Sequence, residues 1–136
     1  MFDLPCSDKN EVIKALTENL AAHGHLVSAQ ECLEDVLKRE AEISTGLVGG
    51  IAIPHTRSRA VKESRVSIGR LTDVIPWETI DGSAVQVVIL ITVPESCQGE
   101  HLKILAALAE RLMEEGVCEG LHTITEKHKI IELLEG

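Results

Sequence analysis

The chain has 136 residues, of which 44% are hydrophobic and 26% are charged, and its formal net charge is −9. A chain of this length buries enough apolar surface to fold without a metal or disulfide staple, and it has no apolar run long enough for a membrane span. Its aromatic content of 1% excludes a base-stacking platform, and its acidity argues against binding to phosphate backbones. We therefore predict one globular domain over residues 1–136, with no nucleic-acid partner and no membrane insertion.

The charge is distributed unevenly along the chain. Residues 55–72 carry five Lys or Arg side chains against one Glu, whereas residues 1–54 and 73–136 are both acidic. A short basic stretch in an acidic protein is explained either by a solvated loop with a chance excess of Arg or by an anion site.

The cysteines and the N-terminal residues indicate the cellular compartment in which the protein is expected. Cys6, Cys32, Cys97 and Cys118 form no Cys-x-x-Cys pair and stand at no zinc-finger spacing from a histidine, so we predict reduced thiols. Residues 1–5 have neither the basic region nor the hydrophobic segment of a secretory signal. A cytoplasmic protein is therefore expected.

Two helices are predicted in the first third of the chain. Apolar residues at helical spacing follow Asp8 and stop before Gly24, which predicts a helix over residues 8–23. Ser28 opens a capping box, and the apolar stripe after it, which includes Cys32, predicts a second helix that ends at about Arg39 or Glu40.

Three strands follow. Glycines and Pro54 bracket a short apolar strand at residues 51–53, and the proline places His55 just past the end of that strand, in an exposed position. Alternating apolar residues predict a strand over residues 64–71 with one wet face. The nearly continuous apolar run over residues 85–93 predicts a central strand that is covered on both faces.

Two more helices complete the prediction. The first runs over about residues 100–115 and ends at Gly116, and the second starts near Thr125. Because helices alternate with strands, we predict an α/β layer sandwich in which a mixed β-sheet is flanked by helices on both faces.

Two of the six histidines are candidates for chemistry. His55 follows a strand end and begins the basic stretch, and an imidazole that is mostly neutral at pH 7 can attack phosphorus or coordinate a metal. His101 opens the long helix after the central strand. If both strands end at the same sheet edge, the two rings converge beside a helix N-terminus, which favours an anion. An ordinary loop histidine and a solvent-facing helix residue are the alternatives.

The other histidines have simpler explanations, and neither a metal site nor a hydrolase site is predicted. Surface or helix-capping roles are expected for His23, His25, His122 and His128. No cysteine or carboxylate stands at metal-ligand spacing from the two candidate histidines, so no metal site is predicted. A Ser-His-Asp hydrolase is excluded because the chain has no Gly-x-Ser-x-Gly elbow.

Several separate segments carry a family resemblance. They are Arg39-Glu40, Ser44-Thr45-Gly46 and Gly50-Ile51-Ala52-Ile53-Pro54-His55, followed by Trp77, Asp81-Gly82, the run 85–91 and His101-Leu102. In this order and spacing, over nearly the whole chain, they resemble the fructose/mannitol-type enzyme IIA domain of the bacterial sugar phosphotransferase system. That family also includes the nitrogen-regulatory IIA proteins.

The resemblance implies a phosphoryl carrier, which is a phosphotransferase component that needs no cofactor. His55 matches the histidine that accepts the phosphoryl group from the phosphocarrier protein HPr and passes it to a cysteine of a IIB domain. His101 matches the family's second histidine, and Arg39 matches its helper arginine. In that role these two residues would hold and neutralise the phosphoryl oxygens.

Thr45, Thr56 and Arg57 are further candidate phosphoryl- or partner-binding residues. Thr56-Arg57 stand where nitrogen-regulatory members usually resemble Gly-Lys, which favours the sugar-transport branch. The alternative function is a regulatory module whose phosphorylation state at His55 switches the binding of a partner protein. A buried His55 would instead favour a chain with this fold that is never phosphorylated.

Overall fold

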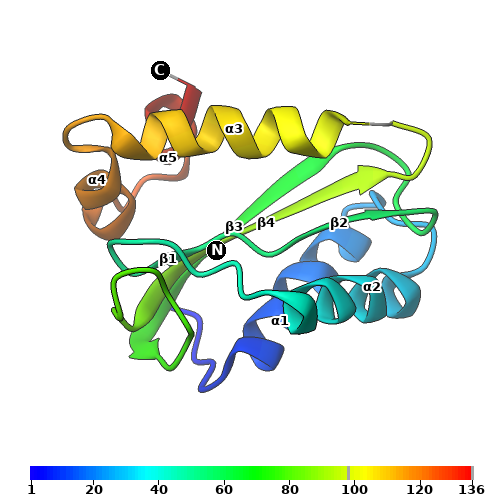
Figure 1. Ribbon diagram of the computed structural model, residues 1–136, viewed down its shortest axis with the longest axis horizontal. Helices are drawn as coiled ribbons and strands as arrows, with labels where there is room; N and C mark the ends of the chain where they lie inside the picture. The colour runs from blue at the N-terminus through cyan, green and yellow to red at the C-terminus, as the bar shows by residue number, and fades with distance from the viewer. Residues whose placement is uncertain (98, 136) are drawn as a thin grey trace. The chain divides into compact units, whose positions relative to one another are not determined.

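The computed structural model describes residues 1–97 and 99–135. The chain divides into two compact units, Met1–His101 and Leu102–Gly136. In chain order the elements are α1 (Lys9–Ala22), α2 (Ala29–Glu42), β1 (Ile51–Ala52), β2 (His55–Ser58), β3 (Arg65–Ile75), β4 (Val85–Pro94), α3 (Glu100–Met113), α4 (Val117–Thr123) and α5 (Lys127–Glu135) (Figure 1). The predicted α/β class is confirmed, whereas the prediction of one domain over residues 1–136 stays a prediction.

Local hydrogen bonds set the ends of α1 and α2. The side chain of Asp8 accepts from the backbone N–H of Glu11 at 2.9 Å, and that of Ser28 accepts from the N–H of Glu31 at 3.2 Å. Both are N-caps, which satisfy donors that have no partner within the helix. Gly24, with φ +77°, follows the end of α1. The two predicted helices are confirmed, and α2 continues to Glu42.

The sheet of the first unit is mixed, as predicted. The central strand β4 pairs in parallel with β1, through Ile51 opposite Val87, and with β2, through Thr56 opposite Thr92. On its other side β4 pairs antiparallel with β3. Thus β1 and β2 form two segments of one interrupted edge strand, and β4 is the buried strand that the apolar run predicts.

The core of the first unit lies between α1, α2 and one face of this sheet. Figure 1 shows the two helices side by side along the strands, and both contact them. The helices contribute apolar side chains at helical spacing, and the strands contribute alternate residues. The fully buried members of this cluster are Val12, Ile13, Leu16, Cys32, Val36, Ala52, Ala60, Val85, Val88 and Leu90.

The first residues of the chain run along the outer edge of β3. The N–H of Leu4 donates to the carbonyl of Arg70 at 3.0 Å, and the N–H of Arg70 donates to the carbonyl of Met1 at 2.9 Å. The guanidinium of Arg70 stacks on the ring of Phe2, 4.6 Å from its centroid. This pairing satisfies backbone groups that an edge strand otherwise leaves open.

The second unit holds most of α3 together with α4 and α5. The predicted long helix is confirmed, but α4 was missed by the sequence prediction. Gly116, with φ +83°, is the N-cap of α4 and connects it to α3. The guanidinium of Arg111 pairs with Glu114 and donates to the carbonyl of Leu133, so it connects α3 to α5. Among the described residues, no helix combines the length and the apolar character that crossing a membrane requires.

The cysteines form no disulfide within the described residues, in agreement with the prediction of reduced thiols. Cys32 is fully buried in α2, and burial raises the pKa of its thiol to about 12. A thiol with such a pKa stays protonated at neutral pH and packs as a small apolar group. This agrees with its place in the predicted apolar stripe.

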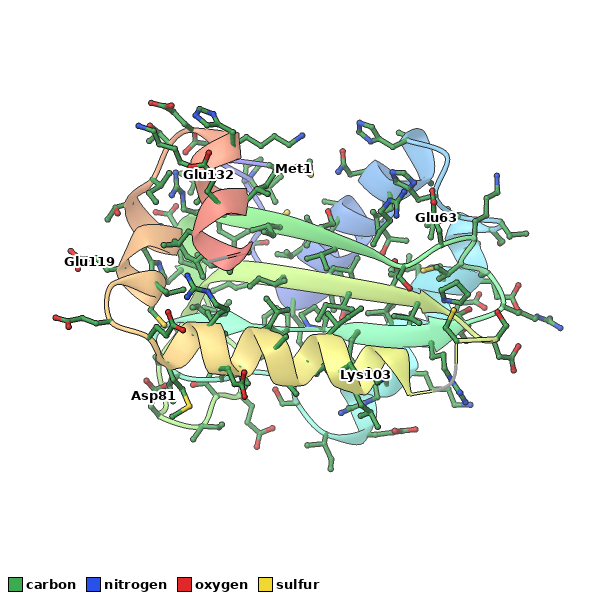
Figure 2. All side chains as sticks on the ribbon, turned by 90° about the horizontal axis from the view of Figure 1, so that it is seen from above. Met1, Glu63, Asp81, Lys103, Glu119 and Glu132 are labelled. Atoms are coloured by element: carbon green, nitrogen blue, oxygen red, sulfur yellow. The ribbon has the colours of Figure 1, made fainter. Side chains whose placement is uncertain are left out.

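Asp81 makes the stability of the first unit depend on pH in the acidic range. Its carboxylate, on the loop before β4 (Figure 2), accepts from the N–H of Gly49 at 3.1 Å, and from the N–H and Oγ of Ser83 at 3.1 and 2.6 Å. These hydrogen bonds lower the pKa of Asp81 from 3.8 to about 2. A lowered folded-state pKa means that this contribution is complete above pH 3.8 and is lost as the pH falls toward 2.

We therefore expect Asp81→Asn to lower the urea midpoint at pH 7, and we expect this difference from wild type to shrink as the pH falls from 4 to 2. Circular dichroism of urea titrations measures both midpoints. Asp73→Asn, at an exposed position on β3, serves as the control. A midpoint difference for Asp81→Asn that stays constant down to pH 2 would contradict the assignment.

Candidate functional site

His55 begins β2 instead of following a strand in a loop. It pairs with Ile91 of β4, and the residue is only 8% exposed, so the prediction of an exposed loop histidine is wrong. The physical reason lies in Pro54. A proline has no N–H for the ladder, but its carbonyl still accepts from the N–H of Ile91 at 3.0 Å. The proline therefore interrupts the edge strand for two residues and does not end it.

The ring of His55 is held in one orientation by the backbone just before it. Its Nδ1 lies 2.9 Å from the carbonyl oxygen of Ile53. A carbonyl oxygen can only accept a hydrogen bond, so Nδ1 carries the proton. In the neutral imidazole the lone pair is then on Nε2, which makes Nε2 the nucleophilic nitrogen.

Arg39 lies in the last turn of α2 and lines an open cleft of about 460 Å³ between α2 and β2. Its Nη1 donates to the carbonyl of Ile43 at 2.9 Å. The residues that line the cleft are Glu31, Asp35, Lys38, Arg39, Glu42, Thr56, Arg57, Ser58, Arg59 and Glu95. The cleft thus brings together three of the predicted site residues, Arg39, Thr56 and Arg57.

Acidic side chains balance part of the basic stretch. Arg59 forms an ion pair with Glu31 of α2, which raises the pKa of the guanidinium above its usual value. Arg65 pairs with Glu63 at 2.8 Å. No such ion pair reaches the guanidinium of Arg57 within the described residues. The lining of the cleft itself carries four basic side chains and four acidic ones, Lys38, Arg39, Arg57 and Arg59 against Glu31, Asp35, Glu42 and Glu95.

Thr45 lies apart from this cleft and serves a buried carboxylate. It is 6% exposed, and its N–H and Oγ1 donate to Glu40 at 3.1 and 2.5 Å. Glu40, which is 4% exposed, also accepts from Trp77 Nε1 at 3.0 Å, and Ser44 Oγ, which donates to the carbonyl of Glu78 at 2.6 Å, lies 3.2 Å from Glu40 Oε1. Lys9 Nζ approaches the same carboxylate to 4.0 Å.

Sequence reasoning named Glu40 as part of the family motif and gave it no role. The signal that could have found it is a charged residue on the buried side of α2, since such residues are rarely buried without partners. Its partners could not be found in the same way, because Trp77 is 37 residues away along the chain.

Three of the other histidines are placed as follows. His101 is the second residue of α3, and its side chain lies outside the described residues. His23 is the C-cap of α1, and its Nδ1 contacts the carbonyl of Asn19 at 2.8 Å. His25 Nδ1 lies 2.9 Å from Glu63. Among the described residues, no three His, Cys, Asp or Glu side chains are grouped so that they could hold a metal ion.

Comparison with known proteins identifies the class of this α/β chain. All of residues 1–136 match the model of the family described as "Phosphoenolpyruvate-dependent sugar phosphotransferase system, EIIA 2". The chain belongs to this family, and the predicted resemblance is confirmed.

Two relatives and one solved structure illustrate the similarity. The phosphotransferase-system fructose-specific EIIA component of Haloferax volcanii is 31% identical over 130 residues, which are 96% of this chain and 84% of that protein. The 2-O-alpha-mannosyl-D-glycerate-specific EIIABC component of Escherichia coli is 34% identical over 131 residues, which are 95% of this chain and 20% of that protein. The chain thus spans a fifth of that relative's length. The crystal structure of nitrogen regulatory protein IIA-Ntr from Neisseria meningitidis matches with a TM-score of 0.89 at 28% identity, over 98% of this chain and 90% of that one.

Proposed function

We propose that this chain is a cytoplasmic phosphoryl carrier that accepts a phosphoryl group on Nε2 of His55 from phospho-HPr and passes it to a IIB cysteine during sugar uptake. The hydrogen bond between His55 Nδ1 and the carbonyl of Ile53 carries the proposal, because it leaves the lone pair on Nε2. The family membership supports the phosphotransferase role.

The transfer needs no cofactor. In the first step the lone pair of Nε2 forms a bond to phosphorus while the bond from phosphorus to the histidine nitrogen of HPr breaks. In the second step a IIB thiolate attacks the phosphorus, and the bond to Nε2 breaks. Three equatorial oxygens carry negative charge in each transition state, and we assign Arg39 and His101 to their stabilisation.

The cleft supplies the surface for a partner or for the phosphoryl oxygens. Thr56 and Arg57 line it beside Arg39, and they follow His55 directly in β2. We assign these two residues to contacts with the phosphoryl group or the partner. Thr45 keeps its predicted binding role only as a proposal, since both of its donors serve Glu40.

Two observations favour other functions. The similarity to the nitrogen regulatory protein IIA-Ntr favours a regulatory module in which phosphorylated His55 changes the affinity for a partner protein. The burial of His55 favours a chain that keeps the fold but takes up no phosphoryl group. The sugar-transport function is preferred to the regulatory one because the fructose-specific relative is 31% identical over most of its own length.

One experiment separates the three functions. The chain is mixed with phosphoenolpyruvate, the activating kinase and HPr, and the intact mass is measured before and after a IIB protein is added. We expect one acid-labile phosphoryl group that disappears when IIB is added. A group that persists in the presence of IIB would favour the regulatory module, and no mass increase would favour the unphosphorylated chain.

A further inference from the structure

We propose that Glu40 is a positioning residue that holds the imidazole of His55 in its reactive tautomer, acting through Thr45 and Ile53. This inference rests on the proposed function, in which Nε2 of His55 is the nucleophile. Glu40 itself does not touch the phosphoryl group, so its effect has to pass through the atoms between the carboxylate and the ring.

Three consecutive hydrogen bonds connect the carboxylate to the ring. The N–H of Thr45 donates to Glu40 Oε1 at 3.1 Å. The N–H of Ile53 donates to the carbonyl of Thr45, also at 3.1 Å. The carbonyl of Ile53 accepts from Nδ1 of His55 at 2.9 Å. Thr45 and Ile53 each donate through the N–H and accept through the carbonyl, so they connect the position of the carboxylate to the position of the ring.

The carboxylate of Glu40, at one end of this chain of hydrogen bonds, is held in a fixed position. Glu40 is 4% exposed, and its carboxylate accepts two hydrogen bonds from Thr45 and one from the indole of Trp77. A buried carboxylate costs desolvation free energy, and its best-attested use is to select one arrangement of the groups around it. Here the selected arrangement is the backbone at residues 44–46, which lies along β1.

The ring depends on this arrangement because Ile53 lies between strands. The N–H of Ile53 bonds to Thr45 and not to β4, and Ile53 lies in the gap between β1 and β2. Without the Thr45 anchor, the carbonyl of Ile53 can turn, and the proton on the ring can then move from Nδ1 to Nε2. That tautomer has no lone pair on Nε2, and a misplacement of about 1 Å slows a reaction by up to about 100-fold.

The test compares four variants of the full chain. Glu40→Ala removes the acceptor. Glu40→Gln keeps one oxygen that can accept from Thr45. Trp77→Phe removes a different hydrogen bond to the same carboxylate and leaves the connection to His55 intact. Glu40→Asp shortens the side chain by one methylene group and so moves the carboxylate away from Thr45. If Glu40→Ala does not fold, Glu40→Asp takes its place in the test.

Two properties are measured after a check of folding by circular dichroism. The ¹⁵N shifts of the His55 ring report the tautomer, and quenched-flow mass spectrometry reports the rate of phosphoryl uptake from phospho-HPr. For Glu40→Ala we expect mixed tautomers and a rate about 10- to 100-fold lower, with a smaller change in the same direction for Glu40→Asp. For Glu40→Gln and Trp77→Phe we expect the wild-type tautomer and a rate close to that of wild type.

A single Nδ1–H tautomer in folded Glu40→Ala or Glu40→Asp would overturn the inference. Equal losses in Trp77→Phe and the Glu40 variants would also overturn it, because they would indicate a general effect on stability. The tautomer measurement is independent of the proposed function: if the wild-type chain took up no phosphoryl group, the proposed function would fail, and the ¹⁵N shifts would still decide the role of Glu40.

Discussion

Replacing His55 with glutamine is expected to reduce phosphoryl uptake to background. Glutamine has a similar length and can hydrogen bond, but its amide nitrogen has no lone pair available to attack phosphorus. Incubation with phosphoenolpyruvate, the kinase and HPr, followed by intact mass measurement at alkaline pH, gives the phosphorylated fraction directly. His23→Gln is the matched control, because that histidine caps α1 and contacts the carbonyl of Asn19. It is expected to leave uptake unchanged.

The residues assigned to the phosphoryl oxygens are expected to behave differently. Arg39→Ala and His101→Ala should slow uptake by about 100- to 1,000-fold, the usual loss for one preorganised donor, and should leave a single phosphoryl group at the end point. If His101→Ala abolished uptake while His55→Gln did not, the two histidines would exchange their roles.

Gly46→Ala is expected to destabilise the chain by about 3 kcal/mol, the upper part of the range for overpacked positions. A Cβ at this position would lie 2.2 Å from the carbonyl oxygen of Glu78 and 2.8 Å from Cγ2 of Thr79. The nearest obstacle is backbone, and the flanking backbone is held as well, since Thr45 bonds to Glu40 and Leu47 bonds to Ile51. Neither side can move aside at low cost.

Gly82→Ala is the control that separates crowding from backbone conformation. Gly82 has φ +75°, and no atom lies within 4 Å of its added Cβ, so this variant measures only the cost of a left-handed conformation, about 1 kcal/mol. Urea titrations of both variants, followed by circular dichroism, give the two free energies of unfolding. A smaller loss for Gly46→Ala than for Gly82→Ala would show that the Glu78 backbone yields.

Elements fixed by nearby residues were predicted well from the sequence. The N-cap of α1 needs only Asp8 and Glu11, and the apolar run of β4 reports its own burial. The strand β2 was missed because its four residues, His55–Ser58, have no apolar alternation, and only their pairing with β4 makes them a strand. That pairing joins residues 36 positions apart along the chain. For the same reason the burial of His55 could not be predicted from the sequence.

The candidate site was predicted in part for a related reason. Arg39, Thr56 and Arg57 were predicted as site residues, and the packing of α2 on β2 places these three side chains around one cleft. The net positive charge counted over residues 55–72 is larger than the charge available to bind an anion, because Glu31 of α2 forms an ion pair with Arg59. A count of charges along the sequence cannot include Glu31, because Glu31 is brought near Arg59 only by folding.

The contact between Trp77 and Glu40 gives this protein a built-in optical signal. Trp77 is the only tryptophan, the chain has no tyrosine, and Trp77 is 8% exposed with its Nε1–H donating to Glu40. Ultraviolet-excited emission therefore comes from a single, nearly dry site that touches the buried carboxylate. Any event that rearranges the hydrogen bonds around Glu40 changes the intensity or colour of that emission, so the unlabelled chain can be followed in a stopped-flow fluorimeter.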